Sequence, residues 1–377
     1  MTAHAPMQSV ADASAIFQQE SNFFYLTGIN APGWWLIVAN NSSWLVMPDI
    51  DDMHQVFDGS MSPEEARQIS GVDTVVTRKE ANTLLEGLAL KHDMVYTLGD
   101  DPYAAHYDFA LNPAPLEMKI KLEKLFAEVG DCRSILSQMR AVKSVEELTT
   151  MQRAIDLTVE AFELAKGVLP DLAHEYEVEA EFTYHFRRHG SQGHAYDPIV
   201  AGGGNACTLH YGANNDPLRQ GELLVLDIGA RVDGYAADIT RTYAIGQLAA
   251  RQKSVHEEVQ SAHQKIIKLL GPGVSVRDYH DQVDVIMKES LVRLGLMADA
   301  SDTDAYRRYF PHAISHGLGI DVHDSLGAPE VFAPGMVLTV EPGIYIPEES
   351  IGVRIEDDIL ITEVGQTNLS GALSTGW

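Results

Sequence analysis

Two aspartates, Asp227 and Asp238, lie in a predicted hairpin of apolar strands. The pair Asp233-Gly234 between them is the strongest short hairpin signal, and a two-residue loop there places Thr240 opposite Asp227. Asp238 then lies one diagonal step away on the same face, with backbones about 7–8 Å apart. Two carboxylates so placed could share a metal ion, whereas two buried like charges without a cation would cost several kcal/mol or shift a pKa. The hairpin alone leaves open the alternative that one aspartate is buried and the other faces solvent.

Three histidines, His312, His316 and His323, fall within twelve residues further along the chain. A single histidine is usually an ordinary surface or core residue. This group also contains Gly317 and Gly319, and glycine lets the backbone approach a ligand closely. Imidazole binds metals and exchanges protons near neutral pH. The cluster therefore predicts a functional site, with ordinary structural histidines as the alternative.

Two glutamates are placed in apolar strands, Glu341 at the end of one and Glu356 within another. A glutamate at such a position is costly unless it is paired or bound to a metal. Arg354 lies on the same face as Glu356, because side chains alternate between the two faces of a strand. A structural ion pair between Arg354 and Glu356 is therefore the alternative, and for these two residues alone it is the simpler explanation.

Together these residues form a candidate donor set of four carboxylates and one imidazole. Such a hard, oxygen-rich set favours Mn²⁺ or Mg²⁺, with Co²⁺ or Zn²⁺ as alternatives. Its four negative charges balance two divalent cations, and two metals about 3.5–4 Å apart can activate a water and polarise a carbonyl. The sequence therefore predicts a site for two divalent metal ions, held by Asp227, Asp238, His316, Glu341 and Glu356.

The elements that must position this set fall into two predicted domains. Residues 1–133 alternate between short strands and helices, which is typical of an α/β domain. The pattern breaks near residue 134, and Ser144 to Glu147 forms a capping box that opens a long helix. Residues 134–377 mix strands and hairpins with grouped helices and are predicted to be α+β, with helices at about 144–166, 174–190, 250–270 and 275–295.

The overall composition excludes several classes of protein. The 377 residues carry 54 acidic and 27 basic side chains, for a formal charge of −27. This balance argues against nucleic acid and anionic membranes as partners, because phosphate binding needs Lys and Arg. No apolar run approaches the roughly 20 residues of a membrane helix, and no signal peptide is visible. Two cysteines, Cys132 and Cys207, exclude a disulfide framework, so we expect a cytoplasmic protein.

The ordered ligand set and its flanking sequences resemble the dinuclear metallopeptidases of the pita-bread fold, family M24. Within this group the chain is similar to aminopeptidase P and prolidase, which cleave Xaa–Pro bonds. The resemblance covers nearly the whole chain and is carried by residues 19–28 and 48–59 near the start and by residues 209–211, 233–241, 316–324, 334–343 and 352–358. It implies a pita-bread catalytic domain over 134–377 and a smaller creatinase-like α/β domain over 1–133.

The resemblance also implies roles for individual residues. Asp227 would bind one metal, Asp238 and Glu356 would bridge both, and His316 and Glu341 would complete the second. A water or hydroxide between the metals would attack the scissile carbonyl, with Glu341 as the proton shuttle. His210 and His323 would hold the substrate and stabilise the developing oxyanion, and His312 would line the proline-side pocket. Arg354 and Tyr345 would support the metal shell and the leaving group. Strand packing is the alternative for Tyr345.

The function expected from the resemblance is that of an Xaa-Pro aminopeptidase acting on proline-containing peptides, with Mn²⁺ as the expected metal and a homodimer as the expected assembly. The first alternative is a prolidase restricted to dipeptides. A second alternative is a non-catalytic binding protein on the same fold. Relatives of that kind typically lose metal ligands, whereas all five are present here.

Overall fold

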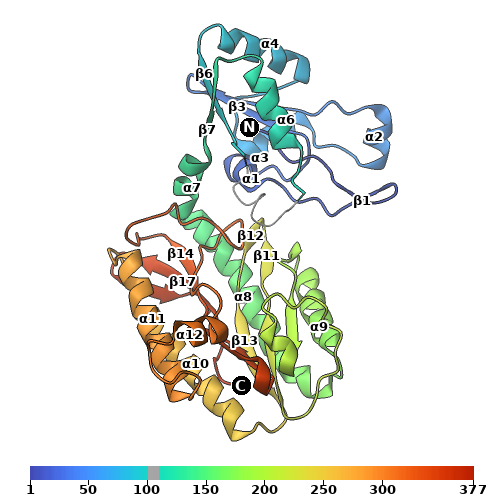
Figure 1. Ribbon diagram of the computed structural model, residues 1–377. Helices are drawn as coiled ribbons and strands as arrows, with labels where there is room; N and C mark the ends of the chain where they lie inside the picture. The colour runs from blue at the N-terminus through green and yellow to red at the C-terminus, as the bar shows by residue number, and fades with distance from the viewer. Residues whose placement is uncertain (101–109) are drawn as a thin grey trace. The chain divides into compact units, whose positions relative to one another are not determined.

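The structure is a computed structural model that describes residues 1–100 and 110–377. The chain divides into two compact units, Met1–Ser137 and Gln138–Trp377 (Figure 1). Helix α7, Arg133–Ala141, contains the division. The sequence-based boundary near residue 134 lies within this helix and stays a prediction about which residues fold independently.

The first unit is built on a small mixed sheet and a separate strand pair. Strands β3 and β4 form a hairpin, and β5 adds to it in parallel, whereas β6 and β7 pair in parallel. The hairpin turns at Asn40 and Asn41, which both adopt positive φ, as this type of tight turn requires. The elements of this unit are β1 Gln8–Val10, β2 Ala13–Ser14, α1 Ser21–Thr27, β3 Trp35–Ala39, β4 Ser42–Val46, α2 Asp52–Phe57, α3 Pro63–Ser70, β5 Thr74–Val76, α4 Arg78–Ala89, β6 Met94–Thr97, α6 Ala114–Glu123 and β7 Glu128–Asp131.

The second unit begins with helix α8, whose first turn is the predicted capping box: Ser144 accepts from the backbone N–H of Glu147, and Glu147 caps Ser144 in return. Its helices are α8 Val145–Val168, α9 Glu175–Arg188, α10 Ala250–Ile267, α11 Val276–Arg293 and α12 Thr303–Tyr309, with short 3-10 turns at Leu169–Asp171, Gly203–Cys207 and Pro347–Glu349. Its strands are β8 Gly193–His194, β9 Ile199–Gly202, β10 Glu222–Asp227, β11 Ala230–Val232, β12 Tyr235–Ala236, β13 Thr240–Ile245, β14 Val337–Val340, β15 Gly343–Ile346, β16 Ile351–Arg354, β17 Asp357–Thr362 and β18 Gly365–Asn368.

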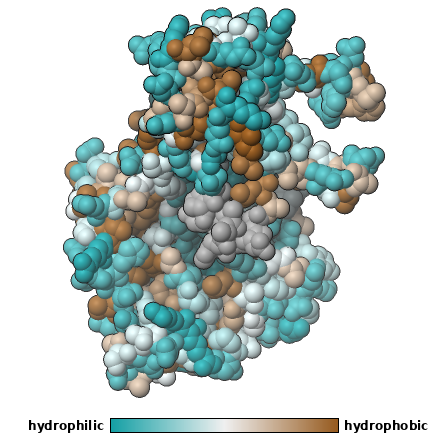
Figure 2. Space-filling model, turned by 45° about the horizontal axis from the view of Figure 1, so that its top comes forward, coloured by the Kyte–Doolittle hydropathy of each residue, from teal (hydrophilic) through white to brown (hydrophobic). Residues whose placement is uncertain are grey.

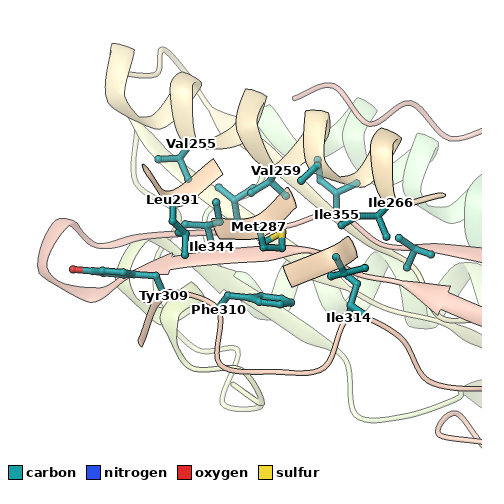
Figure 3. Close-up of a cluster of buried hydrophobic side chains, with 14 of the residues drawn as sticks. Val255, Val259, Ile266, Met287, Leu291, Tyr309, Phe310, Ile314, Ile344 and Ile355 are labelled. Carbon is teal, nitrogen blue, oxygen red and sulfur yellow. The ribbon is translucent and has the colours of Figure 1, made fainter. Parts of the chain in front are cut away.

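Each of two helix pairs in this unit covers its own group of strands. Helices α8 and α9 pack on β10 and β13 through a core that includes Phe162, Phe182 and Leu226. Helices α10 and α11 pack on β14 to β17 through a second core, in which Met287 and Ile355 meet (Figure 3). Because strand side chains alternate between faces, the residues next to these core positions point away from the helices. Asp227 and Thr240, which pair across β10 and β13, therefore lie on the face opposite to that of Leu226.

The visible surface mixes polar and apolar residues. Figure 2 shows hydrophilic residues over much of the visible face, with hydrophobic residues scattered among them. Within the described ranges, no helix is both long and apolar enough to cross a membrane.

Candidate metal centre

The predicted hairpin places the two aspartates as the sequence indicates. Asp227 pairs with Thr240 across β10 and β13, and the loop residues Asp233 and Gly234 both adopt positive φ. Asp238 lies just before β13. Both carboxylates are buried, with Asp227 8% and Asp238 4% exposed. The alternative that one of them faces solvent is therefore wrong.

Glu356 reaches the same point from the two-residue link between β16 and β17, so its predicted place within a strand is wrong. An isolated bridge joins it to Thr240, so Thr240 lies between Asp227 and Glu356. The Thr240 hydroxyl donates to the Glu356 carboxylate at 2.7 Å. One ligand atom each from Asp238, His316 and Glu356 lies within 4.8 Å of the others, which is compatible with a shared metal ion.

His316 and Glu341 close the other side of this cluster. The His316 Nε2 atom lies 3.4 Å from a carboxylate oxygen of Asp238 and 3.5 Å from one of Glu341. Its other ring nitrogen, Nδ1, is 3.0 Å from the carbonyl oxygen of Gly317 and therefore donates to it. A metal-binding histidine is usually held in this way, with its second nitrogen donating to a carbonyl. The free Nε2 is thus aimed at the carboxylates.

A cavity of about 430 Å³ opens onto the cluster. All ten site residues predicted from the sequence lie at this cavity or next to it: the five candidate ligands, His210, His312, His323 and Arg354 line the cavity, and Tyr345 lies directly behind His312 and Arg354. The rest of the lining comes from Tyr196, Asp197, Ile199, Leu209, Tyr211, Gly212 and Val322.

Thr240, which was not among the predicted site residues, pairs with Asp227 on one side and Glu356 on the other. The sequence predicts it as the cross-strand partner of Asp227, and that register was the only signal for its hydrogen bond to Glu356. Two other supporting residues were missed altogether. The Tyr196 hydroxyl donates to Asp227 at 2.6 Å, and the buried carboxylate of Asp358 accepts from the backbone N–H of Asp238 at 3.2 Å. Tyr196 carries no sequence pattern that distinguishes it from an ordinary loop position, whereas Asp358 could have been found by the signal used for Glu356, a carboxylate in an apolar stretch two residues further along.

Arg354 has a different partner from the one that its spacing indicates. Its guanidinium donates to Asp227 at 2.6 Å and to the hydroxyl of Tyr345 at 2.8 Å. The alternative of a structural ion pair with Glu356 is therefore wrong as the main contact of Arg354, although the two side chains are close enough to interact electrostatically. Residues two apart share a face of a strand, but the partner across the site comes from β10, more than a hundred residues away.

The hydroxyl of Tyr345 links Arg354 to His312. Because the Arg354 guanidinium donates to the Tyr345 oxygen, the tyrosine O–H donates to Nε2 of His312, at 2.9 Å. The other ring nitrogen of His312 donates to the carbonyl of Ala313 at 2.7 Å. Burial, followed by the charge of Arg354, lowers the pKa of His312 to about 4. His312 is therefore a neutral ring whose two nitrogens are both occupied.

The electrostatics show that the cluster contains more negative charge than its cations balance. Burial, together with repulsion by Asp238, raises the pKa of Glu341 to about 7 even though His316 opposes this. Burial and the charge of Asp238 raise the pKa of Glu356 well above its usual range. Burial alone would lower the pKa of His316, but its hydrogen bond and ion pair with Asp238 outweigh burial and raise that pKa to about 9. Crowded, buried carboxylates of this kind suit the binding of divalent cations.

The donor set therefore fits the metal ions that the sequence predicts. It offers carboxylate oxygens and one oriented imidazole nitrogen, which suit Mn²⁺ and similar divalent ions. A family model, metallopeptidase family M24, matches residues 149–363, and a second, the aminopeptidase P N-terminal domain, matches residues 1–96. The chain belongs to metallopeptidase family M24.

Individual relatives of this M24 chain agree with the family. An Xaa-Pro aminopeptidase of Haemophilus influenzae is 35% identical over 96% of this chain and 87% of its own length. The low-pH form of Escherichia coli aminopeptidase P is 32% identical, with a TM-score of 0.85 over 99% of this chain and 90% of that one. A zinc-substituted form of the E. coli enzyme in complex with product is 33% identical, with a TM-score of 0.84 over the same shares. The predicted α+β fold, a pita-bread catalytic domain with a smaller N-terminal domain, is confirmed by these matches.

Proposed function

We propose that this M24 chain is an Xaa-Pro aminopeptidase that uses two divalent metal ions. The observation that carries the proposal is the cluster of buried carboxylates around His316 at the base of the cavity. The family, and the names of the relatives, support the substrate class. Asp227, Asp238, His316, Glu341 and Glu356 would hold the two ions.

The bound cations would supply a Lewis acid for the scissile carbonyl and lower the pKa of a water molecule. Glu341 is placed to move the proton, because its carboxylate lines the cavity beside His316 and Asp238. His210 and His323 line the cavity and would donate hydrogen bonds to the carbonyl oxygen as it gains negative charge. Burial, followed by the nearby His316, lowers the pKa of His323, which makes it a neutral donor.

His312 provides a surface for the proline ring. Its nitrogens are occupied by Ala313 and Tyr345, and Phe310 packs edge-on against the ring at 5.1 Å between centroids. The imidazole that lines the cavity is thus fixed in place. A proline residue has no backbone N–H to satisfy, so a flat wall without a free acceptor suits it better than other residues.

Three further expectations concern the metal, the assembly and the location. The oxygen-rich donor set supports Mn²⁺ as the metal, whereas the homodimer and the cytoplasmic location stay predictions from the sequence. The non-catalytic alternative is disfavoured because all five candidate ligands are present and lie together.

The test is hydrolysis of matched peptides by metal-free protein to which Mn²⁺ is returned. We expect two ions per chain, release of the first residue from an Xaa-Pro-Xaa tripeptide, loss of activity with a chelator, and no cleavage of the matching Xaa-Ala-Xaa peptide. Asp238→Ala should abolish cleavage, whereas Glu330→Ala, at an exposed position, should not. Cleavage of Xaa-Pro dipeptides alone would identify a prolidase instead. Full activity without metal would contradict the mechanism.

A further inference from the structure

Arg241 is a fully buried arginine in the strand that carries Thr240. It pairs with Leu226 across β10 and β13, and only 1% of it is exposed. Since neighbouring residues of a strand point to opposite faces, its side chain leaves on the face opposite to that of Thr240, away from the cavity. Arg241 is absent from the cavity lining and so has no direct part in binding substrate.

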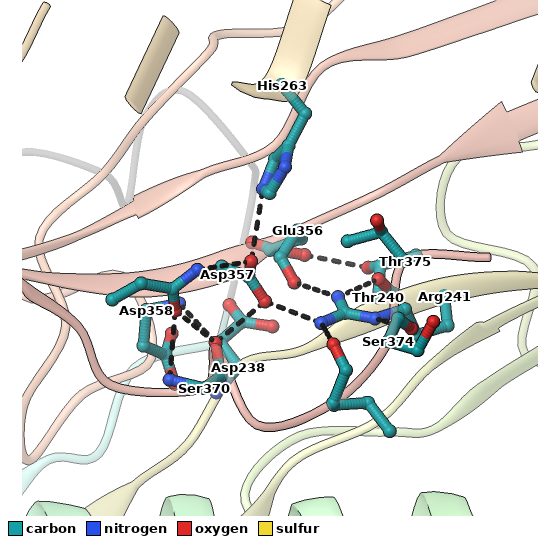
Figure 4. A network of polar contacts seen from close by, with 12 residues as sticks. Asp238, Thr240, Arg241, His263, Glu356, Asp357, Asp358, Ser370, Ser374 and Thr375 are labelled. Carbon is teal, nitrogen blue, oxygen red and sulfur yellow. Dashed lines mark hydrogen bonds and ion pairs between the residues drawn. The ribbon is translucent and has the colours of Figure 1, made fainter. Parts of the chain in front are cut away.

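All five N–H donors of Arg241 have acceptors. Its Nη1 atom donates to the carbonyl oxygens of Thr240 at 2.9 Å and Glu356 at 2.7 Å. Its Nη2 donates to Asp357 at 2.7 Å and to the carbonyl of Leu373 at 2.9 Å, and its Nε donates to the carbonyl of Ser374 at 3.0 Å (Figure 4). A buried guanidinium is stable only when its donors are satisfied in this way.

Two of these contacts act on the backbone of the metal centre. The Thr240 carbonyl that accepts from Arg241 also accepts from the backbone N–H of Glu356, at 3.0 Å. The Thr240 hydroxyl then fixes the Glu356 carboxylate from the other side of the strand. Arg241 therefore holds the backbone of Glu356, a candidate metal ligand, and that of Thr240, whose hydroxyl orients the Glu356 carboxylate.

The other carbonyl acceptors belong to residues 373–374, more than 130 positions along the chain. This segment is fixed independently of Arg241. Leu373 is buried in the core beneath α8 and α9, Gln260 of α10 donates to the Thr375 hydroxyl at 2.8 Å, and Trp377 packs edge-on against His256 with 4.8 Å between ring centroids. It can therefore act as a fixed support against which Arg241 holds the strands.

We infer that Arg241 is a positioning residue of the metal centre, and that the backbone carbonyls of residues 373–374 hold Arg241 in place. Arg241 fixes Glu356 and Thr240 against this segment and so tightens the binding of the divalent ions. The inference rests on the proposed two-metal site. Loss of an outer partner of a metal ligand typically weakens metal binding about 10–100-fold.

The first test measures metal affinity directly, by calorimetric titration of metal-free protein with Mn²⁺. We expect Arg241→Met to weaken binding about 10–100-fold and Arg241→Lys to weaken it less, because lysine keeps the charge but has three donors and no planar fork. The matched control is Arg231→Met. Arg231 also bridges backbone carbonyls, those of Ala195, Gly234 and Ile320, but none of these belongs to a metal ligand, so this variant should bind Mn²⁺ as the unchanged protein does.

The second test removes the support instead of the arginine. Deleting residues 373–377 removes both carbonyls and should weaken Mn²⁺ binding as Arg241→Met does. Deleting only residues 375–377 keeps both carbonyls and the buried Leu373 but removes the contacts of Thr375 and Trp377, so it should weaken Mn²⁺ binding clearly less than the longer deletion. If Arg241→Met does not fold, the two truncations, each confirmed as folded by circular dichroism, decide the question.

The outcomes separate the inference from the proposed function. If the unchanged protein binds no divalent ions, the proposed function fails. If it binds them and folded Arg241→Met or the longer truncation binds them equally well, the inference is wrong and the proposed function stands. Equal weakening by Arg231→Met, or by both truncations, would also overturn the inference, because the effect would then reflect a general loss of structure.

Discussion

The raised pKa of Glu341 predicts that the ligand set destabilises the metal-free protein. Its side chain is 15% exposed, and its pKa is about 7 in the fold against a usual value of 4.5. An acid whose pKa is raised on folding holds its proton more tightly in the folded state, so stability is lost as the pH rises from about 4.5 through about 7. Each pKa unit is worth about 1.4 kcal/mol, so the full penalty above pH 7 is about 3 kcal/mol.

Replacing Glu341 by glutamine removes the charge and keeps the shape. In urea denaturation of metal-free protein, we expect Glu341→Gln to be more stable than the unchanged protein by up to about 3 kcal/mol at pH 8, and by less than about 1 kcal/mol at pH 5. Glu330→Gln, which neutralises an exposed glutamate, is the control and should show no such difference between the two pH values.

Saturation with Mn²⁺ should reverse the order of the two proteins. An ion present at a thousand times its dissociation constant stabilises the fold by about 4.1 kcal/mol, which exceeds the penalty of about 3 kcal/mol, and Glu341→Gln lacks one of the ligands that bind it. The reasoning is refuted if the metal-free variant is no more stable than the unchanged protein at pH 8, or if both lose stability in parallel between pH 5 and pH 8.

Three further predictions concern residues around the site. Arg354→Met should destabilise the metal-free protein by about 3–5 kcal/mol in urea denaturation, because it leaves the Asp227 carboxylate buried without its partner; a loss below 1 kcal/mol would contradict this. Glu175→Ala should raise KM and speed proteolysis within residues 203–216, because the buried carboxylate of Glu175 accepts four hydrogen bonds from the loop that carries His210; an unchanged KM and cleavage rate would count against it. Burial lowers the pKa of His256 to about 4. As the pH falls, the unfolded chain therefore takes up a proton before the folded protein does, and the free energy of unfolding should fall by up to about 3 kcal/mol between pH 6.5 and pH 4. A His256→Gln variant should lose correspondingly less over that range.

Much of the catalytic unit could be predicted from local patterns. The hairpin loop at Asp233-Gly234 sets the register that pairs Asp227 with Thr240, and the structure has that pairing. The capping box at Ser144 marks the start of α8. Both predictions succeed because they depend on residues a few positions apart, where turn geometry and helix capping act directly.

The contacts between distant segments could not be predicted in this way. Periodicity places Arg354 and Glu356 on one face of a strand, but it does not say that Asp227 of another sheet will lie within reach of the arginine. In the same way, Tyr345 reads as a strand residue, and only the packing of β15 beside His312 makes its hydroxyl a link between two side chains of the site.

The sequence by itself determined the chemistry of this protein: the identity of five metal-ligand candidates, their order, and the family that shares them. The tertiary structure alone decided how those ligands are held. It brings ligand atoms of Asp238, His316 and Glu356 within 4.8 Å of one another. It also places Arg354 beside Asp227 and the carbonyls of residues 373–374 within hydrogen-bonding distance of Arg241. The physical reason is that a residue type states which bonds a side chain can make, whereas its partner depends on which strands the folded core brings side by side.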